Sequence, residues 1–168
     1  RSLKTVVAEL GGKNAVIVDA DADLDLAVAD TVISAFGYAG QKCSACSRLI
    51  VVGSAYDELM GRLAEAVRSL PVGPPHLPQT VVPPVISASA RDRIAGYVEL
   101  GRQSARMVAQ ATAPDGPGHY VAPQVFDEVD PASPLATDEI FGPILSVFRA
   151  RSFEEALALA NDTHFGLT

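Results

Sequence analysis

Apolar residues recur at two different spacings along the chain, and these spacings predict strands and helices in turn. Residues 14–18 form a short β-rich run, and apolar residues from Leu24 to Phe36 then repeat at spacings of three and four. Such spacings place side chains on one face of a helix. We therefore expect a strand over 14–18 and an amphipathic helix over 24–36, with the Asp-rich residues 19–23 ending the strand and capping the helix.

The same alternation continues to the end of the chain. A strand is expected over 48–52, and a helix face runs from Tyr56 to Leu70, where Pro71 ends it. The later predicted segments are a helix through 94–98, strands over 106–110, 120–126 and 144–148, and a last helix opened by the capping box 152–155. Six prolines within residues 71–84 predict an exposed loop rather than a linker between domains.

Strands that alternate with helices over short connections are typical of an α/β domain. We expect a largely parallel sheet with helices on both faces, and a single domain over residues 1–168. Hydrophobic residues make up 48% of the 168 residues and charged residues 20%, which suits a buried core.

Charge and cysteine content narrow the class of protein. The net charge of −7 argues against a nucleic acid or an anionic membrane surface as the partner. The apolar runs are much shorter than the roughly 20 residues that a membrane-spanning helix needs. Two Cys and no Trp exclude a scaffold built on disulfides, so we expect a soluble, cytoplasmic protein. The chain begins at Arg1 without Met and stops at Thr168, and we expect it to be a piece of a longer protein.

Cys43 lies between a predicted helix and a predicted strand, in the segment 40–46. A thiol at such a junction can face a ligand while its backbone stays rigid, although a free Cys is more often a small buried residue. Cys43 and Cys46 also have the C-x-x-C spacing of redox and zinc sites. The redox motif needs a helix after its first Cys, and structural zinc needs four ligands. Because a strand follows here and the three His residues are scattered, we expect Cys46 in the core and no metal site.

Two acidic residues, one beside glycines and one near an aromatic residue, are further candidates for functional residues. Glu9 precedes Gly11 and Gly12, where a carboxylate has room to act on water as a general base, although it also suits an ordinary surface position. Glu139 and Phe141 are two positions apart, and in an extended segment they would share a face. Such a pair can contact a sugar hydroxyl and a planar ring, unless Phe141 belongs to the core.

Four motifs in order resemble the aldehyde dehydrogenase superfamily over essentially the whole chain. They are Glu9-Leu-Gly-Gly-Lys13, Gly40-Gln-Lys-Cys43 running on to Ser47-Arg48, Glu139-Ile-Phe-Gly-Pro143, and Asn161-x-Thr163-x-x-Gly166-Leu167. The segment 34–48 also resembles the nucleophile segment of 1-pyrroline-5-carboxylate dehydrogenases, which oxidise L-glutamate γ-semialdehyde either as single enzymes or within bifunctional proline-utilisation proteins. One departure is Val82-Pro83-Pro84-Val85, where relatives carry Gly before the second proline.

The resemblance implies a role for each candidate residue. Cys43 would attack the aldehyde carbon, with its own backbone N–H as an oxyanion donor, and Ser44 would help to hold the substrate. Hydride would pass to NAD, or to NADP, and Glu9 would activate the water that hydrolyses the thioester. Glu139 would bind the nicotinamide ribose, and Phe141 would pack near the nicotinamide.

The resemblance also implies parts that this sequence lacks. No Gly-rich nucleotide segment occurs in it, and the family's cofactor domain and oligomerisation strand would lie outside it. We therefore expect this chain alone to be inactive, and its parent to be a homo-oligomer that acts on a small aldehyde. The alternatives are a dehydrogenase for another small aldehyde, a redox module that uses Cys43 and Cys46, and a domain with a purely structural role.

Overall fold

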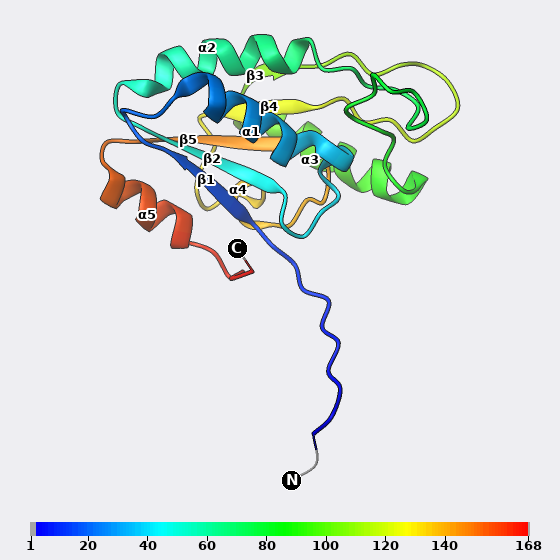
Figure 1. Cartoon of the computed structure of the whole chain (residues 1–168), viewed down its shortest axis with the longest axis horizontal. Helices are drawn as coiled ribbons and strands as arrows, with labels where there is room; N and C mark the ends of the chain where they lie inside the picture. The colour runs from blue at the N-terminus through cyan, green and yellow to red at the C-terminus, as the bar shows by residue number, and fades with distance from the viewer. Residues whose placement is uncertain (1–2, 168) are drawn as a thin grey trace.

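Five strands form one sheet in the computed structural model, which describes residues 3–167 (Figure 1). Their order across the sheet is β1-β2-β5-β4-β3, and every neighbouring pair is parallel except β3 and β4. The strands are β1 (Asn14–Val18), β2 (Cys46–Val52), β3 (Arg106–Gln110), β4 (Gln124–Asp127) and β5 (Ile144–Ala150). Residues 3–10 precede the sheet as an exposed segment that extends away from the body of the molecule.

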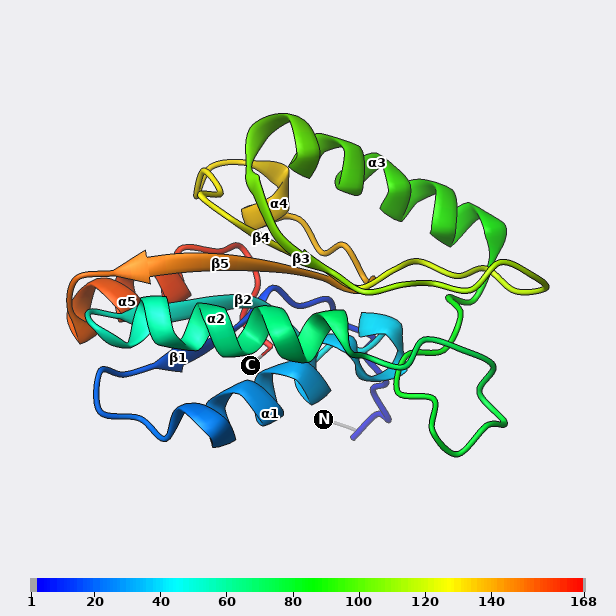
Figure 2. The same ribbon diagram turned by 90° about the horizontal axis from the view of Figure 1, so that it is seen from above.

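Helices cover both faces of the sheet. Figures 1 and 2 show α1 and α2 on one face and the other helices on the opposite face. The helices are α1 (Leu24–Phe36), α2 (Ala55–Arg68), α3 (Ala88–Ser104), α4 (Pro134–Thr137) and α5 (Phe153–Asn161), and a short 3-10 segment, η1 (Gly37–Gly40), follows α1. The α/β fold with a largely parallel sheet is therefore confirmed.

The register of the strands explains why three helices share one face. Arg48, Ser146 and Phe126 lie side by side on β2, β5 and β4, so their side chains point to the same face. Arg48 donates hydrogen bonds of 2.8 Å to two carbonyls near the end of α5, and Ser146 donates one of 3.0 Å to a carbonyl of α4. The ring of Phe126 packs against a glycine of α3 so closely that a Cβ there would lie 2.7 Å away.

Most predicted elements form where the pattern places them. Helix α1 has the predicted bounds, and the Asp23 carboxylate caps it by accepting from the N–H groups of Asp25 and Leu26 at 3.0 and 3.1 Å. Ser152 caps α5 as predicted, but the Glu155 carboxylate accepts from the Arg151 N–H and not from the Ser152 N–H.

The structure differs from the prediction at two points between β3 and β5. Strand β4 begins at Gln124 and not at residue 120, and Pro123 directly before it has no N–H to give to a strand neighbour. The short helix α4 lies in a stretch that the sequence predicts only as polar. The Pro-rich residues form a loop as expected, and within residues 3–167 no helix is long and apolar enough to cross a membrane.

A polar cluster surrounds the buried Asp127 at the end of β4. The Tyr56 hydroxyl donates a 2.9 Å hydrogen bond to the Asp127 carboxylate, which also accepts two from Arg106, at 2.8 and 2.5 Å. Burial alone would raise the pKa of Asp127, but the hydrogen bonds from Arg106 and Tyr56 lower it. Burial and this same hydrogen bond raise the pKa of Tyr56. The cluster therefore binds α2 to the edge of the sheet through a charged carboxylate.

Lys13, directly before β1, is a cation buried without a partner. Its side chain is 1% exposed, and its ammonium nitrogen has no hydrogen-bond partner among the described residues. Burial, and next the positive charge of Arg48, lower the pKa of Lys13 to about 7. In the unfolded chain the group keeps its ordinary pKa of 10.5, so the unfolded state binds more protons between these two values.

We predict that the chain becomes more stable as the pH rises through the neutral range and that Lys13→Met removes this dependence. The free energy of unfolding should rise by roughly 1 to 2 kcal/mol between pH 7 and 8.5, because Lys13 loses its proton in the folded state alone. Below pH 7 the lysine is charged in both the folded and the unfolded state, so the free energy of unfolding should change little with pH. Above pH 9 the Cys46 thiol, whose pKa burial raises to about 12, works in the opposite direction.

Urea unfolding of the purified chain and of the Lys13→Met variant, in reducing buffer from pH 6 to 8.5, measures this difference. Met has nearly the volume of Lys and no charge, so the variant should be more stable than the unchanged chain at pH 7. Its free energy of unfolding should change less between pH 6 and 8.5. Parallel curves for the two proteins would contradict the assignment of the slope to Lys13.

Candidate active site

Three segments meet at one edge of the sheet because each directly precedes one of three neighbouring parallel strands. Residues 9–13 lead into β1, residues 41–45 into β2, and residues 139–143 into β5. Parallel strands that are neighbours begin at the same edge of a sheet, so these distant segments are brought together. An open groove of about 600 Å³ lies between them, lined by Glu9, Leu10, Gly11, Gln41, Lys42, Cys43, Ser44, Glu139 and Phe141.

All five predicted site residues line this groove: Cys43, Glu9, Ser44, Glu139 and Phe141. Glu9 and Phe141, the first and last of them, are 132 positions apart in the sequence. The structure thus brings together the residues to which the sequence motifs pointed.

The Cys43 thiol is exposed on a tight turn that leads into β2. The turn is closed by a 3.0 Å hydrogen bond from the Ala45 N–H to the Lys42 carbonyl. The next N–H along the chain, that of Cys46, donates to the Ser34 hydroxyl of α1 at 3.2 Å. The nucleophile candidate therefore sits on a turn that is fixed both internally and to the preceding helix.

The backbone before this turn is strained. Tyr38 and Ala39 both have a φ of 55°, and Gly40 has a φ of 68°. Left-handed backbone of this kind costs a non-glycine residue about 1 to 3 kcal/mol, so the surrounding packing must hold it. Gly40 is packed so closely in this segment that any side chain there would clash with the Gly142 carbonyl. The segment that leads to Cys43 thus packs backbone to backbone against the segment that carries Glu139 and Phe141.

Cys46 lies in a very different environment from Cys43. Its side chain is 3% exposed, and its thiol donates a 3.4 Å hydrogen bond to the Arg48 carbonyl. Burial raises the pKa of Cys46 to about 12, which opposes the thiolate that exchange chemistry needs. Both cysteines are free, and Cys46 is a core residue as predicted.

Glu139 is anchored by the glycines that follow Glu9. One of its carboxylate oxygens accepts a 2.9 Å hydrogen bond from the Gly12 N–H. The other lies so close to Gly11 that a Cβ there would be 2.7 Å from it. Gly12 in turn packs against the Cys43 carbonyl, with no room for a side chain. The two glycines therefore allow all three segments to approach one another.

Phe141 lines the groove with a backbone conformation that the sequence did not predict. Its φ is 52°, so the segment is not the extended one that would place Glu139 and Phe141 on a common face. Both nevertheless line the groove, and the ring of Phe141 is 39% exposed. The alternative that places Phe141 in the core was wrong.

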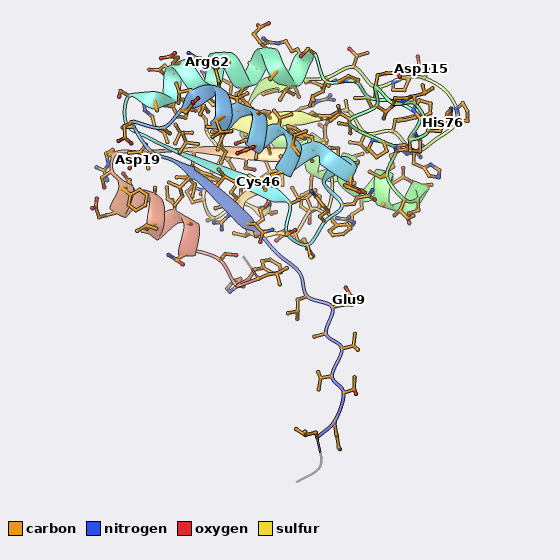
Figure 3. The ribbon with its side chains drawn as sticks, viewed as in Figure 1. Glu9, Asp19, Cys46, Arg62, His76 and Asp115 are labelled. Carbon is orange, nitrogen blue, oxygen red and sulfur yellow. The ribbon has the colours of Figure 1, made fainter. Side chains whose placement is uncertain are left out.

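Glu9 is an exposed residue of the groove lining. It belongs to the exposed segment before β1, and Figure 3 shows it where this segment leaves the body of the molecule. Ser44 is exposed beside Cys43, and the Lys42 ammonium lies 5.7 Å from the centre of the Tyr38 ring. No group of three potential metal ligands occurs within residues 3–167.

Asn14 is a site residue that sequence reasoning missed. It is the first residue of β1 and is 6% exposed. Its side-chain amide donates two hydrogen bonds, of 2.8 Å to the Cys43 carbonyl and of 2.9 Å to the Ala45 carbonyl. A polar residue opening a buried strand is the only sequence signal for it, and that signal does not identify the partner.

Comparison with known proteins gives consistent matches. Residues 1–168 match the aldehyde dehydrogenase family. A 1-pyrroline-5-carboxylate dehydrogenase of Geobacillus kaustophilus is 45% identical over 166 residues, which are 99% of this chain and 32% of that protein. The chain thus spans about a third of the length of such curated relatives.

Solved structures agree with this match. Proline utilization A from Bdellovibrio bacteriovorus superposes with a TM-score of 0.90 at 42% identity, over 93% of this chain and 16% of that one. A 1-pyrroline-5-carboxylate dehydrogenase from Thermus, solved with bound NAD, superposes with a TM-score of 0.88 at 44% identity, over 94% of this chain and 30% of that one. With the family match covering every residue, this chain belongs to the aldehyde dehydrogenase family.

Proposed function

We propose that this chain is the catalytic domain of an NAD-dependent dehydrogenase that oxidises L-glutamate γ-semialdehyde to glutamate. The observation that carries the proposal is the groove, where an exposed thiol, two carboxylates and an aromatic ring converge from three segments. The narrower choice of substrate is supported by the 42–45% identity to 1-pyrroline-5-carboxylate dehydrogenases. The cofactor-binding domain belongs to the rest of the full-length enzyme, by which we mean a polypeptide that contains both domains.

The residues at the Glu139 side of the groove fit the nicotinamide end of NAD. Glu139 uses one oxygen for the Gly12 N–H, which leaves lone pairs on the other to accept from a ribose hydroxyl. The partly exposed ring of Phe141 offers a flat apolar surface to a planar ring. When bound, NAD supplies the acceptor for the hydride that leaves the substrate carbon.

Cys43 carries the first half of the reaction. Its thiolate forms a bond to the aldehyde carbon, and the carbonyl π electrons move onto oxygen, which gives a thiohemiacetal oxyanion. Backbone N–H groups at the turn stabilise this charge, and the Cys43 N–H is one of them. The oxyanion then collapses, the hydride departs with its electron pair, and a thioester to Cys43 remains.

Glu9 carries the second half. As a general base it takes a proton from water, the oxygen of which attacks the thioester carbon. The carbon–sulfur bond breaks, Cys43 leaves as thiolate, and the product carboxylate is released. The exposed position of Glu9 in the groove lining gives it access to solvent water.

We predict that Cys43→Ala abolishes aldehyde oxidation in the full-length enzyme. The loss of kcat should exceed about 1,000-fold, because no other group can form the covalent intermediate. Cys46→Ala is the matched control: it removes a buried thiol three positions away and should lower thermal stability while activity per folded molecule is kept. Steady-state formation of NADH from the semialdehyde measures both, and an active Cys43→Ala enzyme would refute the proposed mechanism.

We predict that Glu9→Gln separates the two halves of the reaction. The thioester should form normally, so stopped-flow absorbance should show a burst of about one equivalent of NADH per active site. Turnover after the burst should fall by about 100- to 10,000-fold, because an amide cannot take the proton of water. Glu99→Gln, on the exposed face of α3, is the control and should leave both phases unchanged. A missing burst would assign Glu9 to an earlier step.

We predict that the full-length enzyme prefers L-glutamate γ-semialdehyde over other small aldehydes. The measurement is kcat/KM for a panel that includes acetaldehyde, succinic semialdehyde and betaine aldehyde, each with NAD and with NADP. The ratio of kcat/KM values expresses the discrimination directly. A higher value for an unrelated aldehyde would retain the dehydrogenase assignment and replace the substrate.

A further inference from the structure

Asn14 holds the turn that carries Cys43 by hydrogen bonds to two carbonyls of that turn. Its side-chain amide donates one hydrogen to the Cys43 carbonyl and the other to the Ala45 carbonyl, at 2.8 and 2.9 Å. Among uncharged side chains, only the amides of Asn and Gln offer two such donors from one nitrogen. Because Asn14 is 6% exposed, these bonds are made away from water, where breaking either leaves a buried group unsatisfied.

The pairing of β1 with β2 directs Asn14 towards this turn. Asn14 pairs with Cys46 and the next residue pairs with Arg48, so Ser47 is an extra residue on β2. An extra residue of this kind disrupts the ladder and re-aims the neighbouring side chains. The Ser47 hydroxyl donates a 3.4 Å hydrogen bond to the Asn14 carbonyl at the same place. The irregularity thus lies where the strand meets the site.

Fixing the Cys43 carbonyl also fixes the peptide bond that follows it. In a trans peptide the N–H points opposite to the C=O, so the Ser44 N–H points away from Asn14. Cys43 and Ser44 both line the groove, and no hydrogen bond within residues 3–167 uses the N–H of either as donor. Two adjacent backbone donors are therefore left for a group bound next to the thiol.

We propose that Asn14 is a positioning residue for the nucleophile, which holds the turn so that the N–H groups of Cys43 and Ser44 receive the oxyanion formed on attack. The inference rests on the proposed function, because it presupposes that Cys43 attacks a carbonyl. It adds the Ser44 N–H as a second backbone donor. Asn14 itself touches no reacting atom and acts only by holding the turn in place. Gly12, packed against the same carbonyl, blocks the turn from moving in that direction.

The test compares a reaction of Cys43 that needs oxyanion donors with one that does not. Hydrolysis of p-nitrophenyl acetate, without NAD, passes through an oxyanion, whereas alkylation by iodoacetamide is a direct displacement that forms none. In Asn14→Ala we expect the acylation rate with the ester, and kcat for the semialdehyde, to fall by about 10- to 100-fold. The alkylation rate of Cys43 and the KM for NAD should stay unchanged. Asn14→Ser keeps one donor and should lose less.

Tyr56→Phe is the control for a loss of stability alone. It removes a hydrogen bond to the buried Asp127 at the opposite end of the sheet, so it should lower thermal stability without changing the ratio of ester acylation to alkylation. All rates are taken per folded molecule in the full-length enzyme. Equal losses in acylation and alkylation, or none in either, would overturn the role given to Asn14. If Cys43→Ala stays active, the proposed function itself fails; if only Asn14→Ala stays active, this inference alone fails.

Discussion

The site depends on a close approach of three backbone segments at Gly12. Its N–H donates a hydrogen bond to the Glu139 carboxylate, and its Cα lies against the Cys43 carbonyl. The segments that carry Glu9, Cys43 and Glu139 therefore meet at one residue. Any side chain there would force the turn away from β1. The absence of a Cβ therefore sets the separation of the groups on which the proposed chemistry relies.

That approach is possible because β1, β2 and β5 are parallel neighbours. Their amino ends share one edge of the sheet, and the segments before them converge there, whereas ligands of open α/β sheets more often lie beyond the carboxyl ends. Near the carboxyl end of β4, the hydrogen bond from Tyr56 to Asp127 binds α2 to the sheet. The polar groups there satisfy one another, whereas the N–H groups of Cys43 and Ser44 at the amino ends have no hydrogen-bond partner within residues 3–167.

Local patterns predicted most of the elements but not the contacts that assemble the site. The spacing in α1 and the Asp23 cap are properties of neighbouring residues, and both were predicted correctly. Asn14 was missed because its partner carbonyls lie 29 and 31 residues away, and only the register of β1 against β2 brings them together. Phe141 was predicted to reach the ligand through extended backbone, yet its left-handed conformation is fixed by packing that no local pattern encodes.

The contrast between the two cysteines follows from where β2 begins. Cys46 is the first residue of the strand and is 3% exposed, so burial keeps its thiol protonated. Cys43 precedes the strand on a turn whose carbonyls face inward to Asn14, which leaves its thiol outside. Three residues of sequence therefore separate a core side chain from an exposed nucleophile candidate. A redox C-x-x-C motif needs a helix N-terminus at its first Cys to favour the thiolate, whereas here a strand begins three residues after Cys43 and burial raises the pKa of Cys46.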